Sequence, residues 1–381
     1  MRCRATPSAF ALSSAALAVL GLVIVGCSRS SPGEGPAQSD LGIGEQVQID
    51  QRGNEVQAVT DVDPVDPAGD GNATCPPVSI AMAGALNGPD AELGVTIKNG
   101  IQLAVDKHNA ANPGCQVQLK PFDTQGDTET ATVVAPQIVD DAYTIGLVGP
   151  AFSGEVKATG DVFDQAGLAA TTASATNGTL SENRWGTFFR GLASDGVQGP
   201  AIANYMRRTL GHHKVCVVDD SSDDGVGLAS AVRESLGALA DSMCNIAVRR
   251  GDEDFSAAVT QINAAAPDSV FFSGGYTQAT EFAQQLRDGG YTGVFVRAAS
   301  PATAEFAEAY TAEFGQEPGA FSAEGYDLGT IMLTGIDSGA ITRPALLEYV
   351  RDYQGQGVAR HYKWTDNGEL ENPVTWIDKV R

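Results

Sequence analysis

The sequence has little positive charge. Its 24 lysines and arginines stand against 47 aspartates and glutamates, and the formal net charge is −23. Proteins that bind the phosphate backbone of nucleic acids need clustered Lys and Arg side chains. The chain offers only short basic pairs, such as Arg207-Arg208 and Arg249-Arg250. We therefore expect no nucleic-acid partner, and we interpret the acidity as a source of solubility.

Histidines are also scarce, as are the residue spacings typical of metal sites. There are four histidines, and no two of the six cysteines have the CxxC spacing typical of zinc sites. The acidic segment Asp220-x-Ser222-x-Asp224-Gly225 begins like a calcium loop, but its twelfth position is Ala231 instead of glutamate. An extracytoplasmic hydrolase would need a nucleophile–base pair or a metal set. Because neither is found, we expect no metal, no cofactor and no enzymatic activity.

The amino end carries the one long apolar run, "MRCRATPSAFALSSAALAVLGLVIVGC". Its basic start and small-residue end favour a secretory signal over a membrane-spanning helix. The final "IVGC" resembles a bacterial lipobox. We expect residues 1–26 to be a lipoprotein signal peptide and Cys27 to become the lipid-modified first residue of the mature chain. Such an anchor holds a protein at the outer face of the cell membrane without spanning it.

Residues 27–75 are predicted to be a disordered acidic tether. "SRSSPGEGPAQSD" and "DVDPVDPAGDGNAT" are rich in Ser, Pro, Gly and Asp. Segments of this composition bury too little apolar surface to become ordered. The intervening "LGIGEQVQIDQRGNEVQ" is expected to form no more than a transient turn.

Four cysteines remain beyond residue 27, an even number that suggests disulfides outside the cytoplasm. Three pairings are possible. Cys75 precedes one predicted strand and Cys115 opens the next; Cys216 lies in a later strand and Cys244 precedes its successor. Because the two strands of a βαβ unit usually lie next to each other, we predict Cys75–Cys115 and Cys216–Cys244.

From residue 76 onward, short apolar strands alternate with helical patterns. Repeated βα alternation predicts parallel sheets with helices on both faces, and a break near residues 190–200 divides the series. We predict an α/β protein with two doubly wound parallel-sheet lobes and an inter-lobe ligand cleft. The expected strands are 78–84, 115–122, 144–149, 168–172, 214–219, 245–250, 269–273 and 293–298.

Unusual sequences follow the carboxyl ends of these strands, where ligands bind in open α/β sheets. They are "GALNGPD", "GPAFSG", "TTASATNG", "DDSSDDG", "SGGYTQ" and "RAAS". Two sets of strand ends that face each other predict a cleft that closes on a small ligand.

This region resembles the branched-chain amino-acid family of ABC-transporter substrate-binding proteins, which have the type I periplasmic-binding fold. The similarity covers nearly all of residues 76–381 and rests on motifs such as "GALNGP", "GPAFSGEVKATGDVFDQAGL", "TTASAT", "FRGLASDGVQGP", "GVGLASAV", "FFSGGY" and "AFSAEGYD". It implies a monomeric receptor that passes a small ligand to a membrane permease. We expect lobe 1 to comprise 76–195 and 301–345, and lobe 2 to comprise 196–300 and 346–381.

The resemblance implies that Ser153 and Thr176 contact the ligand's α-carboxylate, to which Ser174 contributes its backbone, and we expect Ala175 to be a ligand-binding residue as well. A helix start offers unpaired N–H groups to an anion. Ser153 can also be an ordinary helix cap. A nucleophilic role is disfavoured, because "GPAFSG" is not the GxSxG elbow and no base is evident beside it.

Further family positions complete the expected site. Tyr276 corresponds to a tyrosine that contacts the ligand's ammonium and side chain, and its ring face can attract a cation; its alternative is a core aromatic. Leu93, Phe152 and Phe321 correspond to the side-chain pocket. Asp195 corresponds to an acidic residue at the inter-lobe crossover.

The sequence departs from the family where an acid normally pairs with the ligand's ammonium. That position is Ala299, with Arg297 close by. An uncompensated buried ammonium is costly. Either Asp195, Asp223 or Asp224 replaces the missing acid, or the ligand is an aromatic or short-chain carboxylate or an amide. Arg297 suggests a second carboxylate on the ligand, although a surface arginine is more common.

A second departure is a deletion after Ser300. The chain runs almost directly into the helix "AEFAEAYTAEFG", where the family has about one more helix and strand. The deletion bears on how the lobes pack and on whether the protein binds well. A sensory receptor of the same fold, which signals without transport, is the rival function.

Overall fold

The computed structural model describes residues 44–57, 62–300 and 303–380. The predicted signal peptide, Cys27 and the start of the predicted tether lie outside these residues. So does part of the connection that follows Ser300. The chain divides into two units, 1–35 and 36–381, and all described residues belong to the second. Among them, no helix has the length and apolar character that a membrane span requires.

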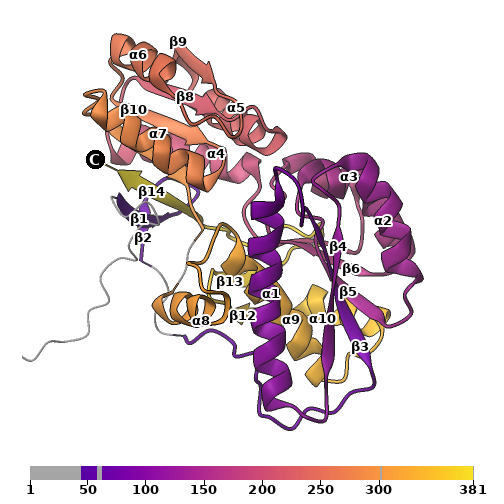
Figure 1. Cartoon of the computed structure of the whole chain (residues 1–381). Helices are drawn as coiled ribbons and strands as arrows, with labels where there is room; N and C mark the ends of the chain where they lie inside the picture. The colour runs from indigo at the N-terminus through magenta and orange to yellow at the C-terminus, as the bar shows by residue number, and fades with distance from the viewer. Residues whose placement is uncertain (1–43, 58–61, 301–302, 381) are drawn as a thin grey trace, which may run out of the picture. The chain divides into compact units, whose positions relative to one another are not determined.

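The first lobe is built on a five-stranded parallel sheet (Figure 1). Its strands in spatial order are β4 (Val117–Asp123), β3 (Val78–Gly84), β5 (Thr144–Val148), β6 (Ala169–Thr172) and β7 (Phe188–Arg190). The strand order reverses between β3 and β5. This reversal leaves a crevice beyond the carboxyl ends of those two strands, which is the usual ligand position in such sheets.

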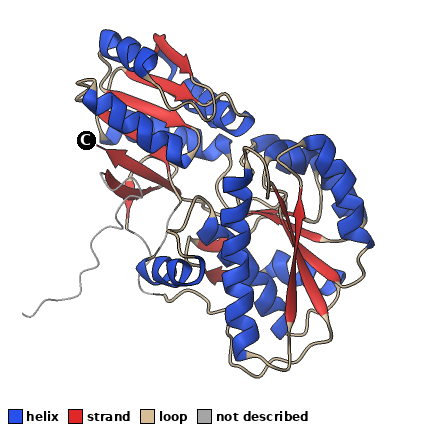
Figure 2. Cartoon of the chain, in the orientation of Figure 1, coloured by secondary structure: helices blue, strands red, loops and turns tan. Residues whose placement is uncertain are grey.

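Strand β3 shows why both faces of this sheet are covered by helices. Ile80 and Met82 lie in one core cluster, whereas Ala81 and Ala83 lie in another, as the two-residue period of a strand requires. The first cluster includes α1 (Ala91–Ala111), α9 (Ser322–Asp337) and α10 (Arg343–Asp352). The second includes α2 (Thr128–Asp140) and α3 (Ser153–Gln165). Figure 2 shows helices beside both faces of this sheet.

The second lobe repeats the same winding and adds antiparallel strands at one edge. Helices α4 (Asp195–Asn204) and α5 (Asp223–Leu236) pack on one face, and α6 (Ser256–Ala265) and α7 (Tyr276–Asp288) on the other. The parallel strands are β9 (Ala240–Ala247), β8 (Val215–Asp219), β10 (Ser269–Ser273) and β11 (Val294–Ala298). The antiparallel strands that follow are β14 (Thr375–Val380), β1 (Gly44–Ile49) and β2 (Glu55–Val56).

Both doubly wound lobes agree with the predicted α/β fold, and both predicted disulfides are present. Cys75–Cys115 joins the approaches to β3 and β4. Cys216–Cys244 joins the neighbouring strands β8 and β9.

The prediction of a disordered tether is wrong for residues 44–56. β1 pairs with β14 over six residue pairs, from Gly44–Val380 to Ile49–Thr375. Val47 and Ile49 are buried in the core of the second lobe. The prediction of a tether rested on the Pro- and Gly-rich composition of the flanking segments. It overlooked the alternation of apolar and polar residues here, which is typical of a strand.

The predicted boundary at residue 345 is also wrong. Leu346 and Val350 of α10 lie in the core of the first lobe, together with Trp364 and Leu370. Leu346 and Val350 are spaced so that one side of α10 is buried. Trp364 and Leu370 bury one side of the later turn. In this later part of the chain only β14 joins the second sheet. β12 (Gln354–Gln356) and β13 (His361–Lys363) form a separate two-stranded sheet. Farther along the chain, a turn at Asn367-Gly368 is closed by a Trp364–Leu370 bridge.

The shortened connection after β11 still reaches the first lobe. Helix α8 (Ala304–Phe314) places Phe306 and Tyr310 in the first lobe's core. The ring of Phe306 meets that of Tyr326 with centroids 5.4 Å apart. The helix that follows Ser300 in the sequence is therefore part of the first lobe's core.

Candidate functional site

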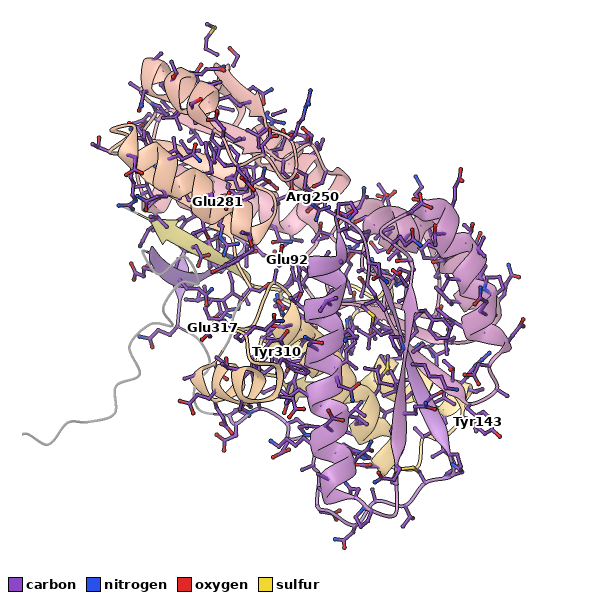
Figure 3. All side chains as sticks on the ribbon, in the orientation of Figure 1. Glu92, Tyr143, Arg250, Glu281, Tyr310 and Glu317 are labelled. Atoms are coloured by element: carbon purple, nitrogen blue, oxygen red, sulfur yellow. A yellow bond between two sulfur atoms is a disulfide. The ribbon has the colours of Figure 1, made fainter. Side chains whose placement is uncertain are left out.

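A cavity of about 370 Å³ lies at the carboxyl ends of both sheets. Its volume is within the range of small-molecule sites. Figure 3 labels Glu92, Arg250 and Glu281, which line it. Among the predicted site residues, the cavity is lined by Leu93, Phe152, Ser174, Thr176 and Phe321 from the first lobe and by Asp224 and Tyr276 from the second. Ser153, Ala175 and Asp195 lie behind this lining.

Ser153 is placed by a sharp turn after β5. Gly149 has φ +128°, and a Cβ there would lie 2.3 Å from the carbonyl oxygen of Ala83, so only glycine fits. The Ser153 hydroxyl donates to Asp224 Oδ1 at 2.9 Å and accepts from the Asn177 N–H at 3.2 Å.

These contacts bear on the two alternatives for Ser153. The residue that caps α3 is Phe152, and Ser153 is the first residue of the helix itself. The contacts of its hydroxyl lead to other elements instead of to the free N–H groups of α3. None of the chain's four histidines, all of which are described, lines the cavity. The geometry disfavours a cap and a nucleophile, and the binding role of Ser153 stays a prediction, because this residue does not line the cavity.

The segment after β6 is held from behind by Arg190, which the sequence analysis missed. Its guanidinium donates to the carbonyl oxygens of Ala175 and Asn177 and pairs with Glu369 at 2.9 Å. Ser174 adds a hydrogen bond from its hydroxyl to the Ala151 carbonyl at 2.6 Å. Arg190 is fully buried, and a lone arginine directly after Phe-Phe was the only sequence signal.

Three carboxyl groups gather beneath Ser153 and Thr176. Burial, together with a smaller contribution from the charge of Asp224, raises the pKa of Glu155 to about 7 and the pKa of Asp195 to about 6. A hydrogen bond from the Thr176 side chain partly opposes the shift at Asp195. Of these three carboxyl groups, Asp224 is the one that lines the cavity.

Replacing Glu155 with glutamine should flatten the pH dependence of stability. The folded state holds a proton on Glu155 up to a pKa of about 7, whereas the unfolded state loses it near the ordinary pKa of 4.5. The free energy of unfolding of the wild type should thus fall as pH rises between these values, by about 3 kcal/mol. In the wild type, Glu155 accepts a hydrogen bond from the Phe152 N–H at 3.2 Å. The glutamine side chain keeps an oxygen that can accept the same hydrogen bond.

Denaturant unfolding from pH 4 to pH 8 tests this expectation. Glu155→Gln should gain stability relative to wild type as pH rises. A constant difference between the two curves would show that Glu155 does not titrate as described.

The second lobe contributes a buried cation. Arg297 is 5% exposed, and its guanidinium carbon lies 4.5 Å from the centroid of the Tyr276 ring. It forms an ion pair with Asp378, whose Oδ1 also accepts from Gln46 of β1 at 3.4 Å. Burial raises the pKa of Asp378 and the charge of Arg297 opposes this shift. Ala299 lines the cavity without charge. Arg297 is thus a buried arginine, not the more common surface one.

Contacts across the cavity join the two lobes. Arg250 forms an ion pair with Asp90, and Thr277 donates to Glu92 at 3.1 Å. The hydrogen bond of Ser153 to α5 is a third such contact. Polar contacts of this kind can form and break as two lobes move about a hinge.

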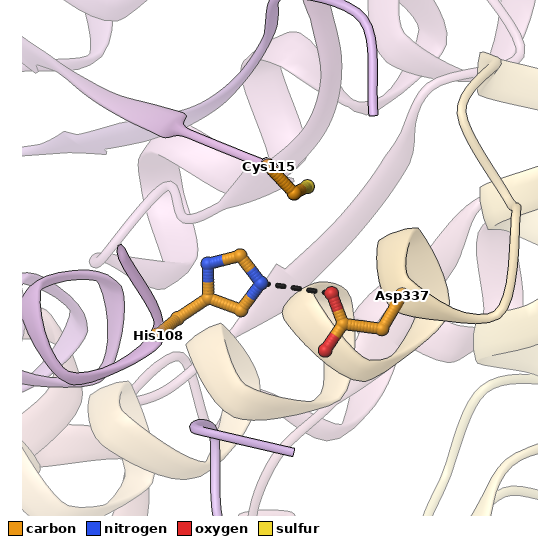
Figure 4. Close-up of side chains that lie close together, drawn as sticks. All are labelled: His108, Cys115 and Asp337. Carbon is orange, nitrogen blue, oxygen red and sulfur yellow. Dashed lines mark hydrogen bonds and ion pairs between the residues drawn. The ribbon is translucent and has the colours of Figure 1, made fainter. Parts of the chain in front are cut away.

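A candidate metal set lies elsewhere in the first lobe. His108, Cys115 and Asp337 come close together (Figure 4). The Cys115 sulfur is bonded to Cys75, so it cannot act as a thiolate ligand. His108 is fully buried and its Nε2 lies 2.8 Å from Asp337 Oδ1. This group holds α1 against α9, and none of its members lines the cavity.

Comparisons with known proteins agree with this architecture. An amino acid binding protein of Pseudomonas aeruginosa is 28% identical over 327 residues, covering 77% of this chain and 87% of that protein. The Leu/Ile/Val-binding protein BraC3 of Rhizobium johnstonii is 31% identical over 214 residues, covering 55% and 58%.

Solved structures share the fold. The branched-chain amino acid transporter substrate binding protein LivJ from Streptococcus pneumoniae, in complex with isoleucine, matches with a TM-score of 0.69 at 24% identity, covering 78% of this chain and 95% of that one. A solute binding protein from R. palustris in complex with benzoate matches with a TM-score of 0.67 at 16% identity, covering 79% and 92%. The model of the periplasmic binding protein family matches residues 77–300, which is more than half of the chain. The chain therefore belongs to the periplasmic binding protein family.

Proposed function

We propose that this protein is the extracytoplasmic solute-binding receptor of an ABC importer and that it binds a branched-chain or related amino acid between its lobes. The observation that carries the proposal is the cavity at both sets of strand ends. It combines the apolar side chains of Leu93, Phe152 and Phe321 with charged groups from both lobes. The names of the sequence relatives, which include Leu/Ile/Val-binding proteins, support the ligand class.

The same proposal includes the cellular setting. Signal cleavage leaves Cys27 as a lipid anchor at the outer face of the bacterial cell membrane, and the receptor acts as a monomer. Closure of the lobes on the ligand forms the surface that a membrane permease recognises. Arg250–Asp90 and Thr277–Glu92 are contacts that such closure makes and opening breaks.

A thermal-shift screen of residues 28–381 tests the ligand class. The fragment keeps residues 44–56, because these strands belong to the second lobe. A ligand at about a hundred times its dissociation constant adds about 2.7 kcal/mol to the free energy of unfolding. We expect L-leucine, L-isoleucine or L-valine to raise the melting temperature.

Ala299→Trp is the matched control, since a large side chain at this cavity position should fill the site and abolish the shift. A shift caused only by acids without an amino group would keep the receptor but replace the proposed substrate. A folded protein that none of these compounds stabilises would contradict the proposal.

A further inference from the structure

The carboxyl group of Asp195 lies directly behind the Thr176 side chain. Thr176 lines the cavity and is expected to contact the ligand's α-carboxylate, whereas Asp195 is the first residue of α4 and does not line the cavity. The Asp195 N–H donates to the Thr176 carbonyl oxygen at 2.8 Å, and the two side chains also hydrogen-bond to each other. The pair therefore joins the cavity wall of the first lobe to the point at which the chain crosses to the second.

Water has little access to this carboxyl group. Asp195 is 7% exposed, and its Oδ1 has no hydrogen-bond partner among the described residues. A Cβ on Gly227 of α5 would lie 2.9 Å from Asp195 Oδ2, so the backbone of α5 packs directly against the carboxyl group. Burial raises the pKa of Asp195 to about 6, and the charge of Asp224 on α5 contributes, while the Thr176 hydrogen bond and the charge of Arg190 on β7 oppose the shift.

A ligand carboxylate at Thr176 makes the ionised form of Asp195 unfavourable for two reasons. Two carboxylates that flank one hydroxyl repel each other, which raises the pKa of one of them. Threonine also has a single hydroxyl proton, and while it is donated to Asp195 it is not available to the ligand. A protonated Asp195 can instead donate to the Thr176 oxygen, which frees the threonine proton for the ligand's carboxylate.

We infer that Asp195 is a positioning residue that takes up a proton when the ligand binds and thereby turns the Thr176 hydroxyl toward the ligand's carboxylate. The inference rests on the proposed function, because it assumes a ligand with a carboxylate at this position. The liganded state holds the proton more tightly than the ligand-free state. Ligand affinity should therefore fall as pH rises above the pKa that Asp195 has in the ligand-free protein.

Calorimetric titration of L-leucine into residues 28–381 tests this coupling without any substitution. In PIPES and in imidazole, whose ionisation enthalpies differ, the binding heats should differ by the contribution of about 0.5–0.9 proton taken up at pH 7. The dissociation constant should rise roughly tenfold or more between pH 5.5 and pH 7.5, a range in which leucine keeps its charges. Equal heats in the two buffers would overturn the inference.

Asp195→Asn imitates the protonated acid, because its amide can donate to the Thr176 oxygen. At pH 7.5 we expect this variant to bind leucine at least as tightly as the wild type and to take up no proton. Glu155→Gln is the matched control. Glu155 also interacts with the charge of Asp224 and titrates near pH 7, but its replacement should leave the proton uptake and the pH dependence of binding in place.

A pH dependence of binding that survives Asp195→Asn, or that Glu155→Gln removes, would also overturn the inference. If the wild type binds none of leucine, isoleucine and valine at any pH tested, the proposed function itself has failed.

Discussion

Replacing Arg190 with methionine is expected to lower the free energy of unfolding by about 3–5 kcal/mol, the usual cost of removing one partner from a buried ion pair. Three groups lose their donor at once: the carbonyl oxygens of Ala175 and Asn177, and the carboxylate of Glu369. The segment between β6 and β7 contributes Ser174 and Thr176 to the cavity. Ligand affinity should therefore fall together with stability.

Glu369→Gln is the matched control for Arg190→Met. It removes the negative charge but leaves the arginine bound to both carbonyl oxygens, so the segment beside the cavity stays in place. We expect a smaller loss of stability and nearly unchanged ligand affinity, measured by urea unfolding and by titration. Equal effects of the two variants would mean that Arg190 acts through the ion pair alone and does not position the segment.

Deleting residues 28–61 is expected to destabilise the second lobe by about 3–6 kcal/mol, because the buried side chains of Val47 and Ile49 each contribute about 1.5–3 kcal/mol. The deletion also removes the donor Gln46 from Asp378, the partner of Arg297, so ligand affinity should fall. It leaves β14 as an exposed edge strand, which favours association between chains.

Deleting residues 28–41 alone is the control, since it leaves all of β1 in place. Melting temperature, ligand affinity and light scattering should match those of residues 28–381. If the longer deletion behaves in the same way as the shorter one, the pairing of β1 with β14 does not contribute to the lobe as described.

Two of the strands that are continuous buried runs were predicted to the residue. The expected strands 78–84 and 269–273 coincide with β3 and β10, because each is a buried run that ends at glycine or serine. β1 was not predictable in this way. Its two buried apolar side chains stand in a polar segment, and its partner β14 lies more than 300 residues later in the chain.

The candidate site shows the same division between local and distant information. The sequence places Ser153 at the end of β5 correctly, because the turn and the start of the helix are local features. Its contact with Asp224 joins residues 71 positions apart. The burial of Arg297 depends on Asp378 near the carboxyl terminus. No local sequence pattern reveals that these pairs meet. The positions of the charges around the cavity could therefore be determined only from the three-dimensional structure.

Titration calorimetry of L-leucine, L-isoleucine and L-valine into residues 28–381 tests the central claim most directly. We predict one ligand per chain and a negative heat-capacity change, because apolar surface leaves water when the cavity closes. Ala299→Trp should bind none of the three. Absence of heat with all three amino acids in a folded wild type, or unchanged binding by Ala299→Trp, would contradict an amino-acid site between the lobes.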